Sequence, residues 1–255
     1  MSSKRKNQIC ALLKGIETGD EASVLVVNPN KYIQHNPHTH EGGEGLAALF
    51  KRISKISPRV NIVRVFSDGD YVFGHTEYDF SSSRIGFEIF RFEGDQTVEH
   101  WDNIQSRLGE NLSDHSMVDG ETIVTDLEKT EENRENVRTF VDTVLIGRQF
   151  QNLSRFVCSN SYTEHNPHLE DGLVSLHKAL KVQADDKSNS FGYNKLHKLL
   201  AEGNFVLSVC EGTIKDIPTS FYDLYRLSNG KIVEHWDTQE TIPPRSDWNN
   251  DNGKF

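Results

Sequence analysis

Two stretches of this sequence occur twice, and this constrains the fold more than any other feature. The segment Tyr32–His38 (YIQHNPH) returns 130 residues later as Tyr162–His168 (YTEHNPH). The segment Glu99–Asp102 (EHWD) returns unchanged 135 residues later as Glu234–Asp237. Two matches in the same order and at nearly equal offsets indicate a duplicated domain, because solenoid repeats are only about 20–50 residues long. The 255 residues of the chain are enough for two domains of ordinary size.

The predicted domain boundaries follow the two copies. The first domain is expected over residues 1–112 and the second over residues 131–245. Residues 113–130 are interpreted as a linker and the tail of the first domain, because this stretch is polar and acidic with little periodicity. Residues 246–255 are expected to be an irregular C-terminal tail.

Helical patterns precede strand patterns within each copy. In the first copy, apolar residues recur at helical spacing over residues 7–18 and 44–54, and a short helix is expected between them at 20–27. Four strands separated by turn residues follow, and the second copy repeats this order. The order predicts an α+β fold in which three helices pack on an antiparallel sheet in each domain. The predicted strands are 60–66, 71–80, 84–92 and 97–104 in the first copy, and 195–201, 204–213, 219–227 and 231–239 in the second.

Composition excludes several classes of partner. A net charge of −10 repels phosphate backbones and anionic headgroups, so we expect neither nucleic acid nor a membrane as a partner. The apolar runs are too short for a signal peptide or a membrane span. Cys10, Cys158 and Cys210 are widely spaced and form no CxxC motif, which argues against a disulfide framework and a thiolate zinc site. A cytoplasmic protein is expected.

The repeated EHWD segment offers an acid to a cavity. Side chains alternate along a strand, so His100 and Asp102 share one face while Glu99 and Trp101 share the other. We expect Asp102 to face a cavity closed by the helices, and Asp237 to do the same in the second copy. A carboxylate in an apolar pocket has a raised pKa and can transfer a proton.

The repeated His-Asn-Pro segment is expected beside that cavity. Proline disfavours α geometry in the residue before it, so His35 and Asn36 lie on a non-helical loop. Phenol, amide and imidazole groups can donate hydrogen bonds to a developing enolate oxygen. His75, on a central strand, is a further candidate, although its counterpart is Val209. The candidate catalytic residues are Asp102, Asp237, His35 and His165, and the candidate pocket residues are Tyr32, Asn36, His75, His100, Trp101, Tyr162, Asn166, His177, His235 and Trp236.

Structural roles compete with these assignments. Asn36 can cap a backbone group in a turn while the neighbouring imidazole fills the rim. Trp101 and Trp236 are typical packing residues. Asp102 and Asp237 are equally suited to a structural ion pair or a turn cap. Both interpretations stay open at the level of the sequence.

Histidines outside the EHWD segment allow two further interpretations. His177 lies on an otherwise apolar helix face, which suits a core or pocket position. Histidine and carboxylate side chains are ordinary ligands of zinc and iron, so a metal site is a second interpretation. The candidate ligands crowd one loop and only part of the set recurs in the second copy, so we expect no metal and no cofactor. These candidates are His35, His38, His40, Glu41 and His100.

Together these motifs resemble the SnoaL-like polyketide-cyclase branch of the nuclear transport factor 2-like superfamily. The resemblance rests on Tyr-x-x-His-Asn-Pro, a following Gly-Leu at a helix start (Gly45-Leu46 and Gly172-Leu173), a β-meander and the closing EHWD, all present twice. It extends to residues 116–120 and 250–255, which are similar to C-terminal tails of single-domain relatives. It implies two cone-shaped domains, each with a bent antiparallel sheet wrapped around an internal pocket.

The resemblance also implies a range of functions, because this superfamily hosts isomerases, cyclases, hydrolases, dehydratases and binding domains. SnoaL-type cyclases use an acid in the cone for aldol chemistry without metal or cofactor, and the matching residues here are Asp102 and Asp237. The expected function is therefore enolate chemistry, of the aldol-cyclase or isomerase type, on a small hydrophobic or carbonyl-containing molecule.

Two other functions remain open on the sequence. One is a non-catalytic protein that binds a small molecule. The other is an assembly module whose cavities are filled by aromatic side chains such as Phe73, Phe87, Tyr222 and Tyr225. Relatives commonly dimerise through their sheets, so the two domains are expected to form an intrachain pseudo-dimer, which leaves further homo-oligomerisation open.

Overall fold

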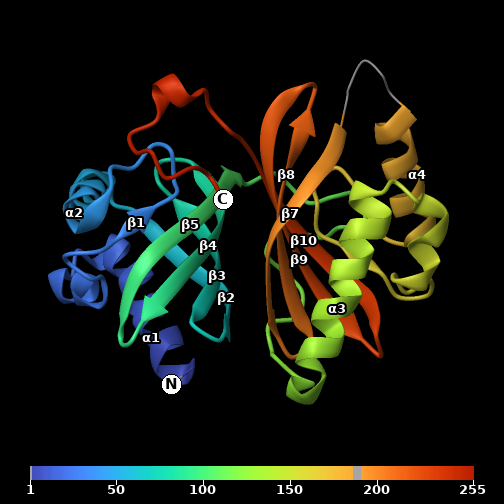
Figure 1. Cartoon of the computed structure of the whole chain (residues 1–255), viewed down its shortest axis with the longest axis horizontal. Coiled ribbons are helices and arrows are strands. Elements are labelled where there is room, and N and C mark those ends of the chain that lie inside the picture. Colours follow the sequence, from blue (N-terminus) through green and yellow to red (C-terminus); the bar gives the residue numbers. More distant parts are fainter. Residues whose placement is uncertain (1, 186–190) are drawn as a thin grey trace. The chain divides into compact units, whose positions relative to one another are not determined.

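In the computed structural model, which describes residues 2–185 and 191–255, the chain divides into two compact units (Figure 1). Unit 1 comprises Met1–Arg107 together with Ile242–Phe255, and unit 2 comprises Leu108–Thr241. Each unit combines helices with a five-stranded sheet. The predicted α+β class is confirmed for both copies.

The two connecting segments lie elsewhere than the sequence pattern predicts. Residues 113–130 are expected to close the first domain, whereas they pack within unit 2. The C-terminal residues 242–255 pack within unit 1. Each repeated motif is therefore covered by a segment that follows the other copy in the sequence. The reason lies in hydrogen bonds between these segments and the motif histidines, described below.

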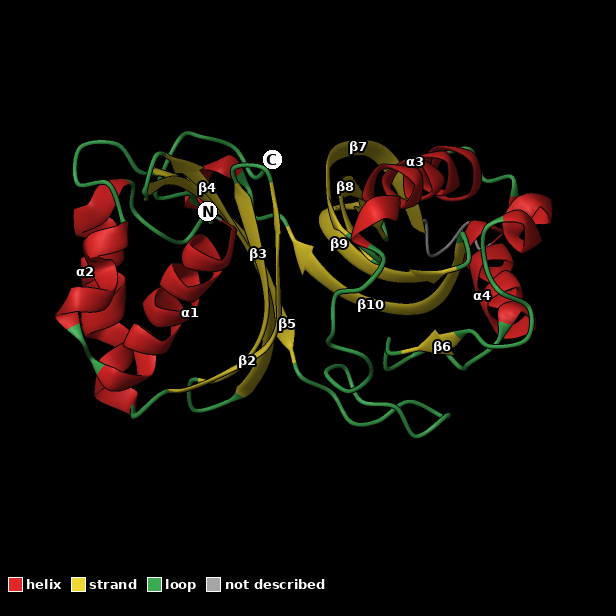
Figure 2. Ribbon diagram, turned by 90° about the horizontal axis from the view of Figure 1, so that it is seen from below, coloured by secondary structure: helices red, strands yellow, loops and turns green. Residues whose placement is uncertain are grey.

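Unit 1 carries its helices on one face of the sheet (Figure 2). The strand order is β1-β5-β4-β3-β2, and the pairs are antiparallel except for β1, which runs parallel to β5. The elements are α1 (Ser2–Thr18), the 3-10 helix η1 (Glu21–Val26), β1 (Ile33–Gln34), α2 (Gly42–Ile53), the 3-10 helix η2 (Ser54–Ile56), β2 (Arg59–Asp68), β3 (Tyr71–Asp79), β4 (Ser83–Glu93), β5 (Gln96–Ser106) and, in the C-terminal segment, the 3-10 helix η6 (Arg245–Asp247).

Unit 2 repeats this arrangement with the strand order β6-β10-β9-β8-β7, and β6 again runs parallel to the last strand. A π-helical turn continues its first helix. The elements are the 3-10 helix η3 (Leu127–Lys129), α3 (Thr130–Phe140), the π-helix η4 (Val141–Ile146), the 3-10 helix η5 (Phe150–Arg155), β6 (Thr163–Glu164), α4 (Leu173–Asp185), β7 (Phe191–Glu202), β8 (Phe205–Ile214), β9 (Ile217–Ser228) and β10 (Lys231–Thr241).

The core of each unit lies between the helices and the sheet. In unit 1, the predicted helical stripe of Ile9, Leu12 and Leu13 is buried against strand residues. In unit 2, Val137 and Phe140 of α3 take the same role. Each such side chain contributes roughly 1.5–3 kcal/mol when it is fully buried. The helices are thereby held over the concave face of each sheet.

The described helices are all too short or too polar to cross a membrane. The longest of them, α1, has 17 residues and carries several charges. Cys10, Cys158 and Cys210 all lie in the described part of the chain and carry free thiols.

The short parallel strands bring the two repeated segments together. Gln34 of β1 is in register with His100 of β5, and Glu164 of β6 with His235 of β10. The amide of the residue that follows each short strand donates a 2.9 Å hydrogen bond to the carbonyl of that histidine. The Tyr-x-x-His-Asn-Pro loop therefore lies at the edge of the EHWD strand in both units.

Candidate functional site

Each unit encloses a cavity between its helices and the concave face of its sheet. The cavity of unit 1 has a volume of about 140 Å³, and that of unit 2 about 190 Å³. Both are smaller than the roughly 300–1,000 Å³ typical of sites for drug-sized ligands. Apolar and aromatic side chains make up most of the walls. A small, mainly apolar molecule would fit either cavity.

The strand alternation places the EHWD acid at the cavity in both units. His100 and Asp102 line the cavity of unit 1, and His235 and Asp237 line that of unit 2. Asp102 is 4% exposed and Asp237 is 5% exposed. The predicted pocket residues from the other motif also lie at the cavities, namely Tyr32 and Asn36 in unit 1 and Tyr162 and Asn166 in unit 2.

The motif asparagine connects the turn to the acid. Asn36 Oδ1 accepts a hydrogen bond from the His38 amide at 2.8 Å, and its Nδ2 donates to Asp102 Oδ2 at 2.6 Å. In the second unit, Asn166 Nδ2 donates to both oxygens of Asp237, at 2.9 and 2.8 Å. The asparagine therefore caps the turn and also orients the carboxylate, so the structural and the site interpretations both apply to it.

The motif histidine of unit 1 lies away from the cavity, which corrects the expectation that it lines the site. His35 stacks on Trp101 with ring centroids 4.6 Å apart. Its Nε2 lies 3.0 Å from Glu99 Oε1, and its Nδ1 lies 2.7 Å from the carbonyl oxygen of Gly253 in the C-terminal segment. Trp101 and Glu99 occupy the opposite strand face from Asp102, as alternation requires. His35 therefore contacts the tail, Trp101 packs against His35, and neither lines the pocket.

Unit 2 repeats this correction. His165 stacks on Trp236 with centroids 4.6 Å apart, and its Nε2 lies 2.9 Å from Glu234 Oε1. Its Nδ1 lies 2.9 Å from the carbonyl oxygen of Ser116, in the segment at the start of unit 2 that follows the first copy in the sequence. Trp236 Nε1 donates to the carbonyl of Asp119 in the same segment at 2.9 Å. His165 and Trp236 therefore bind this segment, instead of taking the catalytic and pocket-lining roles expected for them.

Two further predicted pocket histidines lie outside the cavities. His75 is fully buried, with its Nδ1 3.1 Å from Arg64 Nη1 and its ring 4.7 Å from that of Phe87. It pairs with Phe87 across the strands, which places it on the sheet face opposite Asp102. His177 is exposed on α4, because the helix turns this position away from the apolar stripe that lines the cavity.

The sequence interpretation missed a second acid in each cavity. Glu88 of β4 is the cross-strand neighbour of Asp102, and Asp223 of β9 is the neighbour of Asp237. Both second acids lie on the cavity wall and are buried. Each precedes its EHWD acid by the same number of residues in a strand otherwise rich in apolar residues. That coincidence between the copies is the signal that could have identified them.

A histidine bridges two polar partners at the cavity floor of unit 1. His100 Nε2 lies 2.8 Å from Glu88 Oε2, and its Nδ1 lies 3.0 Å from Gln34 Oε1. The Tyr78 hydroxyl donates to Glu88 Oε1 at 2.8 Å. Tyr32 is 3% exposed, and its hydroxyl has no hydrogen-bond partner among the described residues. Burial, together with the charge of Glu88, raises the pKa of Tyr32 well above its usual value, so the phenol stays protonated.

One carboxylate oxygen of Asp102 accepts a hydrogen bond, and the other has only an ion pair with Lys254. Its Oδ2 accepts the hydrogen bond from Asn36, whereas its Oδ1 accepts none from the part of the chain that the structure describes. Lys254 of the C-terminal segment is 4% exposed, and its Nζ lies 3.5 Å from Asp102 Oδ1 while donating to the Asp102 carbonyl at 2.8 Å. An ammonium group at this distance stabilises the charge of a carboxylate.

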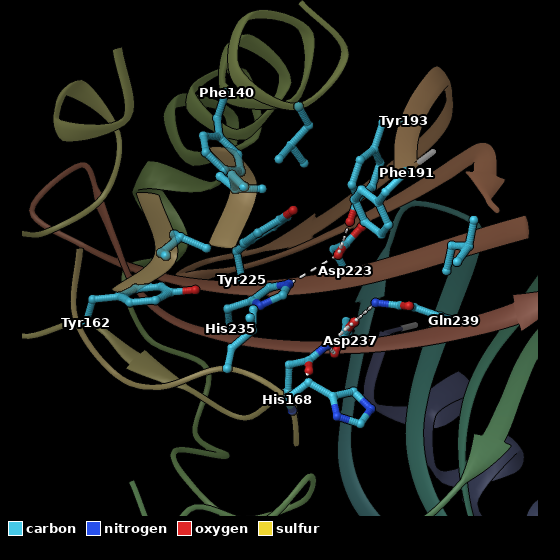
Figure 3. Close-up of a pocket in the computed structure, with 16 residues that line it drawn as sticks. Phe140, Tyr162, His168, Phe191, Tyr193, Asp223, Tyr225, His235, Asp237 and Gln239 are labelled. Carbon is cyan, nitrogen blue, oxygen red and sulfur yellow. Dashed lines mark hydrogen bonds and ion pairs between the residues drawn. The ribbon is translucent and has the colours of Figure 1, made fainter. Parts of the chain in front are cut away.

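The corresponding histidine of unit 2, His235, lies between the carboxylates of Glu164 and Asp223, and Figure 3 shows its contact with Asp223. His235 Nδ1 is 2.8 Å from Glu164 Oε1, and its Nε2 is 3.2 Å from Asp223 Oδ1. Burial opposes its charge, but the two carboxylates outweigh burial and raise the pKa of His235 well above its usual value. Tyr162 donates to Glu164 Oε2 at 2.5 Å, and Tyr193 donates to Asp223 Oδ1 at 3.0 Å.

Both carboxylate oxygens of Asp237 accept hydrogen bonds, and its pKa is raised. Asn166 donates to both oxygens, and Gln239 Nε2 donates to Oδ2 at 2.7 Å. Burial raises the pKa of Asp237 from 3.8 to about 6. The positive His235 opposes this increase, and the negative charge of Asp223 adds to it. Asp237 therefore changes its charge near neutral pH.

One difference within the repeated motif separates the two sites. The second residue of the short strand is Gln34 in β1 of unit 1 and Glu164 in β6 of unit 2. Glu164 has two acceptor oxygens, and one of them takes the hydrogen bond of Tyr162. Gln34 uses its single acceptor oxygen for the Asn36 amide and for His100 Nδ1, and the hydroxyl of Tyr32 has no hydrogen-bond partner among the described residues.

Among the described residues, two groups of side chains have ligand atoms within 4.8 Å of one another, close enough for one metal ion. In each group, hydrogen bonds within the protein use some of these atoms, as in the 2.8 Å contact between His100 and Glu88 and the 2.8 Å contact between His165 and Asp119. The groups are Glu88, His100 and Asp102, and His115, Asp119 and His165.

Comparison with known proteins finds similarity only among solved structures. No protein-family model and no curated protein sequence matches the chain. A proposed ketosteroid isomerase from Kribbella flavida aligns with 16% identity and a TM-score of 0.39, covering 46% of this chain and 84% of that protein. IdmH, a proposed polyketide cyclase from Streptomyces antibioticus, aligns with 14% identity and a TM-score of 0.36, covering 40% and 91%.

A third solved structure is an LEH-like epoxide hydrolase from M. tuberculosis, which aligns with 18% identity and a TM-score of 0.36. This alignment covers 44% of this chain and 85% of that protein. In each of the three cases, less than half of this chain matches most of the other protein. Each of these alignments spans a length close to that of one unit of this chain.

Proposed function

We propose that unit 1 is a cofactor-independent enzyme domain that forms an enolate from a small carbonyl compound. The observation that carries this proposal is a carboxylate oxygen of Asp102 and a phenol hydroxyl of Tyr32, both without a hydrogen-bond partner among the described residues, at one apolar cavity. Buried polar atoms are nearly always hydrogen-bonded in folded proteins. Two such atoms at one cavity are therefore best explained by a ligand that uses both.

The reaction follows from the chemistry of these two groups. Asp102 Oδ1 removes a proton from the carbon next to the carbonyl group, and the Tyr32 hydroxyl donates a hydrogen bond to the oxygen as it becomes negative. If the substrate carries a β,γ double bond, the resulting dienolate takes the proton back from Asp102 at the γ-carbon, which gives an isomer. Otherwise the α-carbon of the enolate attacks a second carbonyl carbon, whose oxygen takes the proton, which gives an aldol product. Asn36 and Lys254 hold the carboxylate during these steps.

The walls of the cavity suit this chemistry. Leu12 and Leu13 of α1, Leu46 of α2 and Phe90 of β4 line the space above the acid. Apolar walls exclude water, which strengthens the interaction of the Tyr32 hydroxyl with a developing oxyanion. The small volume favours compounds of the size of cyclohexanone over fused-ring substrates.

Exchange of α-protons with solvent tests the proposal directly. Cyclohexanone, acetophenone and ethyl acetoacetate are incubated with the protein in D₂O, and loss of the α-proton signal is followed by NMR. We expect exchange above the buffer rate for at least one compound, and a loss of about 10²–10⁴-fold in Asp102→Asn. Asp237→Asn is the matched variant and is expected to leave this exchange unchanged. Full exchange in Asp102→Asn would remove the proposed base.

The alternative is a non-catalytic protein that binds a small molecule, and one observation favours it for unit 2. There the hydroxyl of Tyr162 is bound to Glu164, and both oxygens of Asp237 accept hydrogen bonds. Neither group is open to assist an enolate. If every ketone exchanges at the buffer rate while a ligand still binds, the alternative holds for unit 1 as well.

A further inference from the structure

We propose that the cavity of unit 2 binds a small organic cation, an alkyl- or arylammonium group held between aromatic rings and the Asp223 carboxylate. This inference goes beyond the enolate chemistry proposed for unit 1 and does not depend on it. It rests on the side chains that line the cavity, on one buried oxygen and on the balance of charge.

The cavity is walled by aromatic rings on several sides (Figure 3). They come from α3, from the loop before β6, and from strands β7 and β9, and they surround the space above the two carboxylates. The faces of aromatic rings attract cations, and cages of such rings are a common way to bind ammonium groups. The five rings belong to Phe140, Tyr162, Phe191, Tyr193 and Tyr225.

One carboxylate oxygen at the floor is open to a donor. Asp223 is 1% exposed, and its Oδ1 accepts hydrogen bonds from Tyr193 and lies 3.2 Å from His235 Nε2. Its Oδ2 is buried and has no hydrogen-bond partner in the described part of the chain. Asp223 lines the cavity, so a ligand can reach this oxygen. An ammonium N–H is the donor that best matches an unpaired carboxylate oxygen.

The balance of charge also selects a cation. Asp223 and Asp237 line the floor, and His235 is the positive group between Asp223 and Glu164, which contacts it from outside the cavity. Among the described residues that line the cavity, neither lysine nor arginine occurs. One imidazolium balances only one of the two carboxylates of Asp223 and Glu164. The net charge here is therefore negative whether or not Asp237 is ionised. An anionic ligand would be repelled here.

Unit 1 gives the internal contrast. Its cavity is lined by Arg52, its acid lies beside Lys254, and the position of Glu164 is taken by the neutral Gln34. The same fold therefore presents a less negative floor in unit 1. An organic cation should prefer unit 2, and the two cavities should bind different ligands.

The test compares three ammonium compounds with their neutral alcohols by isothermal titration calorimetry on the full chain. The pairs are isobutylamine and isobutanol, cyclohexylamine and cyclohexanol, and benzylamine and benzyl alcohol, at pH 7.5. We expect at least one ammonium compound to bind tenfold or more tightly than its alcohol. Asp223→Asn should weaken that ammonium compound by about tenfold or more and leave the alcohol unchanged, because a hydrogen bond to a charged group is lost.

Two further variants keep the proposal open to refutation. Glu88→Gln makes the equivalent change in unit 1 and should leave ammonium binding unchanged. Phe140→Leu keeps the apolar wall but removes one ring, and it should weaken the ammonium compound more than the alcohol. The proposal is overturned if no ammonium compound binds, if the alcohols bind equally well, or if Glu88→Gln rather than Asp223→Asn abolishes binding.

Discussion

At the scale of single residues, the exchange of Gln34 for Glu164 separates two otherwise similar sites. Glutamate offers two acceptor oxygens and holds the hydroxyl of Tyr162, whereas glutamine offers one and leaves the hydroxyl of Tyr32 unbound. The substitution also adds a negative charge beside the bridging histidine of unit 2. One side chain thereby changes both the hydrogen-bond donor and the charge that a ligand meets.

Gln34→Glu should convert the site of unit 1 toward that of unit 2. The new carboxylate should bind the Tyr32 hydroxyl, and α-proton exchange should fall by about 10²–10³-fold, the usual cost of losing one oxyanion donor. Tyr32→Phe is the reference variant and should lose as much. The double variant should lose little more than either single one, because both changes remove the same donor. Independent, multiplying losses in the NMR exchange assay would contradict this mechanism.

At the scale of elements, each repeated motif holds a segment from outside its own copy. The His35 ring contacts the Gly253 carbonyl, and the His165 ring contacts the Ser116 carbonyl. Asn250 and Asn252 of the C-terminal segment donate further hydrogen bonds to two main-chain carbonyls of the first motif and to that of Thr39, the residue after it. The two segments are therefore bound to the motif loops beside each site, on the side of the sheet away from the cavity.

A pair of glycines tests how closely these segments are packed. Gly120 and Gly253 both adopt positive φ angles, +88° and +86°. A Cβ at Gly120 would lie 2.1 Å from Glu234 Oε1, whereas no described atom lies within 4 Å of a Cβ at Gly253. Gly253→Ala should cost only the backbone penalty of about 1–2 kcal/mol. Gly120→Ala should cost a further 1–3 kcal/mol or so through overpacking.

Hydrogen exchange followed by mass spectrometry measures these two costs separately. Gly120→Ala should speed the exchange of β10 peptides in unit 2, and Gly253→Ala should affect β5 peptides in unit 1 to a smaller extent. Equal effects of the two variants would show that the contact at Gly120 is relieved without cost.

The C-terminal segment should also matter for the reaction of unit 1, because Lys254 lies beside Asp102. Deletion of residues 249–255 should lower α-proton exchange by tenfold or more, since the carboxylate loses its buried ammonium neighbour and gains water. Lys254→Met keeps the segment in place and should reproduce most of that loss, whereas Lys254→Arg should restore part of it. Normal exchange in the truncated chain would exclude a role for this segment.

At the scale of the whole molecule, most of the correct predictions came from the sequence repeat and from the alternation of side chains along strands. The duplicated α+β fold, the order of helices and strands, and the positions of Asp102 and Asp237 at the cavities follow from short-range patterns. The clamping role of His35 depends on contacts with Gly253, more than 200 residues away, and short-range patterns contain no information about such contacts. The proposed pairing of the two units as a pseudo-dimer stays a prediction.

The second acid of each cavity was missed for a related reason. Glu88 and Asp223 lie on strands whose other cavity-facing residues are apolar, and a single acid in such a strand is not distinctive. Such an acid can be recognised as part of a site only when the strand register places it opposite the acid of the neighbouring strand. Register depends on the turns and on the bulges that the strands contain, and these cannot be derived from alternation alone.

The stability of the chain should depend on pH through Asp237. Its pKa in the folded chain is about 6, above the ordinary value of 3.8, so the folded chain binds more protons than the unfolded chain between these values. Stability therefore falls as the pH rises from about 4 to 6. A difference of about 2 pH units corresponds to about 3 kcal/mol. Asp237→Asn cannot titrate and should lack this contribution.

The measurement is hydrogen exchange of β9 and β10 peptides in the wild-type chain and in Asp237→Asn at several pH values, corrected for the intrinsic pH dependence of exchange. The free energy of opening of the wild type minus that of the variant should fall by about 2.4 kcal/mol between pH 4 and pH 7, because the unfolded carboxylate is already partly ionised at pH 4. Most of the change should occur below pH 6, because above the folded pKa both states of the wild type are ionised and the difference becomes constant. Parallel profiles for the two chains would mean that Asp237 is as acidic in the folded unit as in the unfolded one, and that water reaches its carboxylate through the cavity.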